Sequence, residues 1–121
     1  MKHQILVVDD DMTTRTLLSA LLKSNGYEVR VAEGGTQALD ACNAQLPDLV
    51  LLDLFMPDMS GHDVAAQLKS NSDSKHTPII MLTGSDDQSE IAKAHENGAC
   101  DYVIKPFEAM ELLDKIKRAM A

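Results

Sequence analysis

The sequence contains few of the residues that mark disulfide-rich or nucleic-acid-binding proteins. It has no tryptophan, only 3% aromatic residues and two cysteines, Cys42 and Cys100. The cysteines are far apart and match no metal or redox spacing, so we expect free thiols, buried or half-buried, in a reducing cytosol. Lys and Arg number 11 against 19 Asp and Glu, which gives a net charge of −8. This balance disfavours direct binding to nucleic acid or to an anionic membrane.

Long hydrophobic runs are also missing. No apolar run approaches the roughly 18 residues that a transmembrane helix needs. The first apolar run, residues 5–8, is too short for a signal peptide. The chain has 121 residues, of which 45% are hydrophobic and 25% charged, and these values are typical of one globular domain. We therefore expect a cytoplasmic protein whose residues 1–121 form a single domain.

Short apolar runs recur along the chain about every 20 to 30 residues, which is the spacing of repeated strand–helix units. They predict strands at residues 5–8, 29–31, 49–52, 79–82 and 102–104. The segments between them have helical periodicity, with Ser60 and Ser85 expected as caps at helix starts and Gly26 and Gly98 at helix ends. Alternating strands and helices predict a parallel α/β sheet with right-handed crossovers.

Polar residues follow the predicted strands at their carboxyl ends, where ligands collect in folds of this class. These residues are four aspartates, a threonine and a lysine: Asp9, Asp10, Asp11, Asp53, Thr83 and Lys105. Clustered carboxylates suit a hard cation such as Mg²⁺, while the lysine and threonine suit a phosphoryl group. Asp53 is placed to act as a nucleophile that accepts that group. We expect Asp11 instead to cap the following helix.

Four segments carry a resemblance to a known family. They are ILVVDDD (5–11), LVLLDLFMPDMSG (49–61), PIIMLTGS (78–85) and GACDYVIKPF (98–107). In order and spacing the chain resembles the CheY-like receiver domain of two-component response regulators. The resemblance implies a flavodoxin-like, doubly wound parallel sheet of five strands in the order 2-1-3-4-5. It also implies five flanking helices, two on one face and three on the other.

The resemblance further implies a phosphoacceptor and a metal site. Asp53 would accept a phosphoryl group from a sensor histidine kinase, a histidine phosphotransfer protein or a small phosphodonor. Mg²⁺, with Mn²⁺ as a possible substitute, would bind Asp10 and Asp53 directly and Asp9 partly through water. The backbone carbonyl of Phe55 would complete the protein ligands.

Roles for further residues follow from the same resemblance. Thr83 would be the switch hydroxyl that moves to the phosphoryl group, and Tyr102 the aromatic residue that swings inward behind it. Lys105 matches the family lysine, and its bond to Pro106 is expected to be cis. The output partner, a downstream protein or a fused domain, would bind the face near Tyr102 and the last helix. The resemblance leaves open a monomer or a phosphorylation-dependent dimer.

The resemblance also implies that the side chains at positions 55 and 85 tune the lifetime of the phosphoryl group. We expect the bulky side chain of Phe55 to shield the aspartyl-phosphate from water. Gly84 is small enough to leave access for a donor, and Ser85 is small and neutral. Outside the site, we expect Asp58 to be exposed. The four histidines match no metal spacing, so we expect them at the surface: His3, His62, His76 and His95.

Other functions remain to be weighed against this interpretation. A phosphatase of the haloacid-dehalogenase type needs a second aspartate where this chain has Phe55. A flavodoxin-like electron carrier needs a hydroxyl-rich phosphate loop where this chain has acids, and aromatic residues to flank a flavin. The chain also fits a receiver module from a larger multidomain regulator or hybrid kinase.

Overall fold

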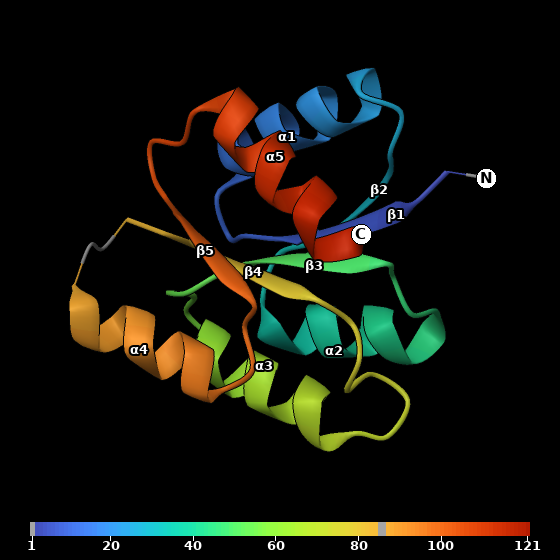
Figure 1. Cartoon of the computed structure of the whole chain (residues 1–121). Coiled ribbons are helices and arrows are strands. Elements are labelled where there is room, and N and C mark those ends of the chain that lie inside the picture. Colours follow the sequence, from blue (N-terminus) through green and yellow to red (C-terminus); the bar gives the residue numbers. More distant parts are fainter. Residues whose placement is uncertain (1, 85–86) are drawn as a thin grey trace.

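The computed structural model describes residues 2–84 and 87–121 and consists of alternating strands and helices (Figure 1). The strands are β1 (Gln4–Val8), β2 (Glu28–Ala32), β3 (Leu49–Asp53), β4 (Ile79–Thr83) and β5 (Asp101–Ile104). The helices are α1 (Met12–Ser24), α2 (Gly35–Ala44), α3 (Gly61–Ser70), α4 (Gln88–Glu96) and α5 (Ala109–Met120). The strands predicted from the apolar runs are thus confirmed. Within the described ranges, no helix is long and apolar enough to span a bilayer.

The strands form one parallel sheet in the order β2-β1-β3-β4-β5, as predicted. Helices α1 and α5 cover one face, and α2, α3 and α4 cover the other (Figure 1). The central strands β3 and β4 are buried along their whole length, which explains their nearly continuous apolar sequences. Their carboxyl ends, on the side away from the labelled N-terminus, lie at one edge of the sheet.

The core consists of two layers, one on each face of the sheet. Successive residues of β1 alternate between them: Ile5 and Val7 pack towards α1 and α5, while Leu6 and Val8 pack towards α2, α3 and α4. All four side chains are completely buried. Burial of one such side chain contributes roughly 1.5–3 kcal/mol to folding. The two layers therefore hold the strand ends in fixed positions.

Two helix caps predicted from the sequence are confirmed. The Asp11 carboxylate at the start of α1 accepts hydrogen bonds from the Thr13 amide at 3.3 Å and the Thr14 hydroxyl at 2.8 Å. The Ser60 hydroxyl at the start of α3 accepts one from the Asp63 amide at 3.2 Å. Such side chains satisfy amides that have no partner inside the helix.

The expected helix ends are also present, whereas one expected helix start is displaced. Gly26 and Gly98 follow α1 and α4 with φ of 89° and 97°, which a glycine adopts without strain. Helix α4 begins later than predicted. Its cap is Asp87, which accepts a hydrogen bond from the Ser89 amide at 2.9 Å. Ser85, the expected cap, lies outside the described residues.

Candidate functional site

The carboxyl edge of the sheet brings together the side chains that the sequence placed at the strand ends. Asp9 is completely buried, Thr83 is 2% exposed and Asp53 is 6% exposed, while Asp10 lies at the surface. One carboxylate oxygen from each of Asp9, Asp10 and Asp53 lies within 4.8 Å of the other two. Residues far apart in the sequence thus form one acidic cluster.

Lys105 supplies the positive charge of this cluster. Its Nζ lies 2.7 Å from Asp9 Oδ2 and 3.5 Å from Asp53 Oδ1. The Lys105 amide donates to the Thr83 carbonyl, which aligns the ends of β4 and β5. Burial lowers the pKa of Lys105, but the hydrogen bonds and charges of the two carboxylates outweigh burial and raise it overall. The side chain therefore stays protonated. The Lys105–Pro106 peptide bond is cis, as expected.

The Asp53 carboxylate is held in an unfavourable place for a negative charge. Burial, followed by the charge of Asp9, raises the pKa of Asp53 to about 6, although the Lys105 charge and the Phe55 amide act in the opposite direction. Three carboxylates face one ammonium group, so the cluster has an excess of negative charge. Clustered carboxylate oxygens are the ligands that Mg²⁺ prefers. The residues present therefore fit a hard divalent cation.

The loop between β1 and α1 is held by contacts on both sides of Asp9. The Asp9 Oδ1 atom accepts a hydrogen bond from the Asp11 amide at 2.9 Å, while its Oδ2 contacts Lys105. Arg15 donates from Nη1 to the Asp9 carbonyl at 2.7 Å and from Nη2 to Glu33 at 3.2 Å. Sequence reasoning missed Arg15, because no local pattern shows that the first turn of α1 directs this side chain back to the loop.

The loop between β3 and α3 begins directly after Asp53. The Leu54 amide donates to the Leu82 carbonyl at 3.0 Å, and the Gly61 amide donates to the Leu54 carbonyl at 2.8 Å. A Cβ atom on Gly61 would lie 2.4 Å from the Asp53 carbonyl, so only glycine permits this approach. Phe55, whose carbonyl is an expected metal ligand, follows Leu54 with its side chain 58% exposed.

Tyr102, the expected switch residue, is half-buried on β5. Lys115 donates from Nζ to the Tyr102 carbonyl at 2.7 Å, and the same atom lies 5.1 Å from the centre of the Tyr102 ring. The His95 ring contacts the Tyr102 ring edge-on with a centroid distance of 6.3 Å. Tyr102 thus joins β5 to α4 and α5. Its inward movement stays a prediction.

The two remaining positions expected to tune the site lie after Thr83. Gly84 is exposed, and a Cβ atom added to it would meet no heavy atom within 4 Å among the residues that the structure describes. This open space agrees with the expectation that Gly84 leaves access for a phosphodonor. Ser85 lies outside the described residues, so its expected role stays a prediction.

The expectation that all four histidines lie at the surface is wrong for His62. Its side chain is on the inner face of α3 and is buried, with Nε2 2.8 Å from Glu90 Oε2 on α4. The sequence shows only one polar residue next to a glycine, so the contact with α4 could not be foreseen. The other three are exposed, as expected: His3, His76 and His95.

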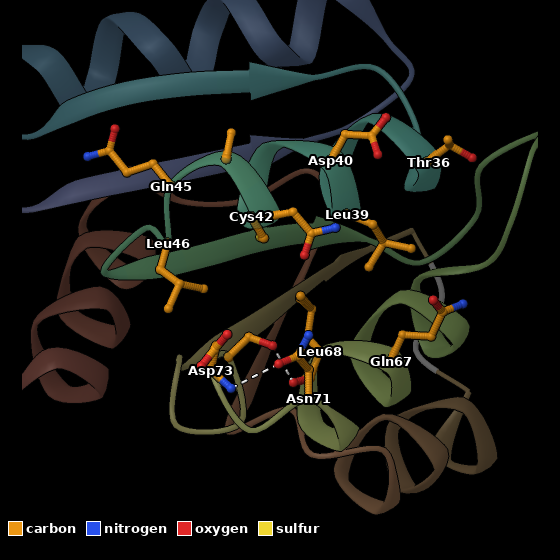
Figure 2. A pocket seen from close by; sticks show the side chains of 13 residues that line it. Thr36, Leu39, Asp40, Cys42, Gln45, Leu46, Gln67, Leu68, Asn71 and Asp73 are labelled. Atoms are coloured by element: carbon orange, nitrogen blue, oxygen red, sulfur yellow. Dashed lines mark hydrogen bonds between the residues drawn. The ribbon is translucent and has the colours of Figure 1, made fainter.

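The cysteines are free, as predicted, but only one is buried. Cys42 is buried, whereas Cys100 is exposed, which corrects the expectation of two buried or half-buried thiols. Cys42 lines a pocket of about 590 Å³ along α2 and α3. Figure 2 shows Leu39 and Leu46 on the α2 side of this pocket and Gln67, Leu68, Asn71 and Asp73 across from them. No residue of the acidic cluster lines this pocket.

Residues 5–117 match the family model described as the response regulator receiver domain. The chain belongs to this family. The DNA-binding response regulator MtrA of Mycobacterium tuberculosis is 42% identical over 117 residues, which cover 97% of this chain and 50% of MtrA. The response regulator MprA of Mycolicibacterium vanbaalenii is 43% identical over the same length and the same shares. The chain thus spans about half the length of the curated relatives it matches.

Solved structures of receiver domains have the same fold. A candidate response regulator from Chloroflexus aurantiacus superposes with a TM-score of 0.96 at 37% identity, over 99% of this chain and 98% of the other. The chemotaxis protein CheY4 of Vibrio cholerae superposes with a TM-score of 0.94 at 31% identity, over 98% and 99% of the two chains. The predicted CheY-like fold is thus confirmed, and the phosphatase and electron-carrier alternatives lose their support.

Proposed function

We propose that the chain is the phosphoacceptor module of a two-component phosphorelay and that Asp53 is the acceptor. The supporting observation is the buried Asp53 carboxylate between two further aspartates and Lys105. An Asp53 oxygen attacks the phosphorus of a phosphohistidine on a sensor histidine kinase or a phosphotransfer protein. A P–O bond to Asp53 forms, the P–N bond breaks and the donor imidazole leaves. The cytoplasm, where such donors occur, is the proposed compartment.

The acidic cluster gives this reaction its requirement for a divalent cation. Asp9, Asp10, Asp53 and the Phe55 carbonyl would hold Mg²⁺, or Mn²⁺ as a substitute. When bound, the ion neutralises the carboxylates and the phosphoryl oxygens. Lys105 complements it, since its Nζ lies 3.5 Å from an Asp53 oxygen and can bind the incoming phosphoryl group.

The response to phosphorylation begins at the neighbouring strand ends. A phosphoryl group on Asp53 adds negative charge and strong hydrogen-bond acceptors. Thr83 and Lys105 are the donors at the ends of β4 and β5, so both gain a new partner. The Tyr102 side chain then swings inward behind Thr83, and this movement changes the surface formed by β5 and α5. A partner that binds the two arrangements with different affinity then shifts their equilibrium.

Output passes through this face to a downstream protein or to a fused domain. The length of the curated relatives favours a receiver module within a larger regulator. A phosphorylation-dependent dimer would use the same changed surface, and a monomer would expose it to another protein. The lifetime of the signal depends on slow hydrolysis, which Phe55 and Ser85 tune, while Gly84 leaves access for the phosphodonor.

Phosphorylation with a small donor tests the proposal. After incubation with acetyl phosphate and Mg²⁺, the wild type gains one phosphoryl group by intact mass, whereas Asp53→Asn gains none. Asp10→Asn loses the Mg²⁺-dependent gain. Asp11→Asn is the matched control and retains it, because Asp11 caps α1. A wild type that neither gains phosphate nor changes its NMR spectrum with beryllofluoride and Mg²⁺ would refute the proposal.

A further inference from the structure

The tip of the loop between β3 and α3 is attached to a helix that has no role in the site so far. Asp58 is exposed, as predicted, yet its carboxylate makes two long-range contacts. Its Oδ1 accepts a hydrogen bond from the Gly35 amide at 3.1 Å, and its Oδ2 accepts one from the Thr36 amide at 3.0 Å. Both amides belong to the first turn of α2.

Helix α2 lacks a capping side chain of its own. Its N-cap residue is Gly34, which has no side chain to accept a hydrogen bond. The first amides of a helix need partners from outside the helix, and they attract a negative charge. Asp58, which lies on a different loop, supplies both the hydrogen-bond acceptors and the negative charge. These two hydrogen bonds lower the pKa of Asp58 to about 2, so the carboxylate stays charged at neutral pH.

The two glycines at the start of α2 permit the contact. A Cβ atom on Gly34 would lie 2.7 Å from Asp58 Oδ1, and one on Gly35 would lie 2.0 Å from Cγ of Met59. Neither glycine has a positive φ, so the requirement is for space and not for backbone conformation. The Gly34–Gly35 pair thus lets the loop tip dock against the helix.

This docked loop carries Phe55, which lies two residues after the proposed phosphoacceptor. The base of the loop is closed by the hydrogen bond between the Gly61 amide and the Leu54 carbonyl. Between these two residues, Asp58 holds the tip on α2. Phe55 lies on the same short segment, two residues after Asp53. The position of Phe55 is therefore set from the base and from the tip.

We propose that Asp58 is a positioning residue, which holds Phe55 in place beside Asp53 by anchoring the loop tip to the first turn of α2. The inference rests on the proposed function, since the Phe55 carbonyl is a proposed metal ligand there. A loop released from α2 would place the amide and the carbonyl of Phe55 less precisely. Residues that orient a metal ligand change metal affinity although they do not touch the metal.

The test compares Asp58→Ala with Ala41→Gly. Ala41 lies in α2 away from the loop, and glycine there weakens the helix without removing the anchor. Both variants should lower the melting temperature. Only Asp58→Ala should shift the Phe55 amide resonance in metal-free protein and weaken Mg²⁺ binding, by roughly tenfold. Asp58→Asn keeps one acceptor oxygen. Its Phe55 amide resonance and its Mg²⁺ affinity should therefore lie between those of Asp58→Ala and the wild type.

Two outcomes would overturn the anchoring role. In one, Asp58→Ala leaves the Phe55 resonance and the Mg²⁺ affinity at their wild-type values, so that Asp58 only caps α2. In the other, Ala41→Gly changes both as strongly, so that the effect comes from lost stability. The Phe55 resonance is measured without metal or phosphodonor. It therefore decides for or against the anchor even if the wild type accepts no phosphoryl group.

Discussion

Charged side chains have different partners at the two edges of the sheet, where the amino ends and the carboxyl ends of the strands lie. At the amino edge, Lys69 donates to the carbonyls of Lys75 and Thr77 at 3.1 and 2.7 Å, and Asp48 accepts from the Gln4 amide at 2.7 Å. Backbone groups there satisfy the charged side chains. At the carboxyl edge, three carboxylates crowd around one ammonium group within the same small site.

The difference separates polar groups that support folding from those that support function. The amino-edge contacts join the start of β1 to the residue before β3 and fix the segment that leads into β4. The carboxyl-edge carboxylates repel each other, and burial raises the pKa of Asp53 further. Such a cluster lowers the stability of the metal-free protein, while in the proposed function the same residues would hold a cation and a phosphoryl group.

The largest expected effect distinguishes Lys105, at the carboxyl edge, from Lys69, at the amino edge. Lys105→Met should reduce the initial rate of phosphorylation by acetyl phosphate on the order of a hundredfold, because the transferred phosphoryl group loses its half-buried positive partner. Lys69→Met should lower the melting temperature, since two backbone carbonyls lose their donor, and should leave the rate nearly unchanged. Initial rates by intact mass and thermal unfolding measure both effects. An equal loss of rate in the two variants would remove the functional distinction between the edges.

A smaller effect concerns stability. Because the pKa of Asp53 is raised from 3.8 to about 6 in the fold, the ionised group opposes folding above that range. This cost in the free energy of folding is absent below pH 3.8, grows between pH 3.8 and 6, and reaches its full value above pH 6. Asp53→Asn should therefore raise the free energy of unfolding at pH 7.5 by about 1–3 kcal/mol without Mg²⁺. Urea unfolding at several pH values measures the difference.

Mg²⁺ and a second aspartate provide the controls for this stability effect. The difference between Asp53→Asn and the wild type should shrink towards pH 4, and also when Mg²⁺ neutralises the cluster at pH 7.5. Asp48→Asn, at the amino edge, should give no gain in stability, because Asp48 accepts a backbone hydrogen bond there. Wild-type stability equal to or above that of Asp53→Asn at pH 7.5 without Mg²⁺ would contradict the account.

The smallest expected effect concerns the lifetime of the phosphoryl group. Phe55→Asn should speed hydrolysis several-fold, because a polar side chain beside the acceptor no longer keeps water away. Leu46→Asn replaces another exposed apolar residue, outside the site, and should leave the rate at its wild-type value. Dephosphorylation followed by intact mass gives both rates. An unchanged or slower rate for Phe55→Asn would remove the shielding role.

The parts of this structure that follow from local sequence could be predicted. Continuous apolar runs identify β3 and β4, and capping residues identify the starts of α1 and α3. The meeting of Asp9, Asp53 and Lys105 also follows, because the carboxyl ends of parallel strands lie at one edge. Their placement needed only the order of strands and helices.

Contacts between helices and loops could not be predicted in this way. The hydrogen bonds of Asp58 to α2 depend on the path of the loop after β3, which is separated from the start of α2 by more than 20 residues. The pairing of His62 with Glu90 depends on how α3 and α4 are rotated about their axes. Neither contact leaves a periodic or spacing signal in the sequence, so each became visible only with the side chains in place.

The most direct test of the central claim is to locate the phosphoryl group. Borohydride reduces an aspartyl-phosphate to homoserine, and peptide mass spectrometry then identifies the modified position. After treatment with acetyl phosphate and Mg²⁺, we expect homoserine at position 53 and none when Mg²⁺ is omitted. Homoserine at position 9 or 10 instead, or none at position 53 in protein that has gained a phosphoryl group, would contradict the account.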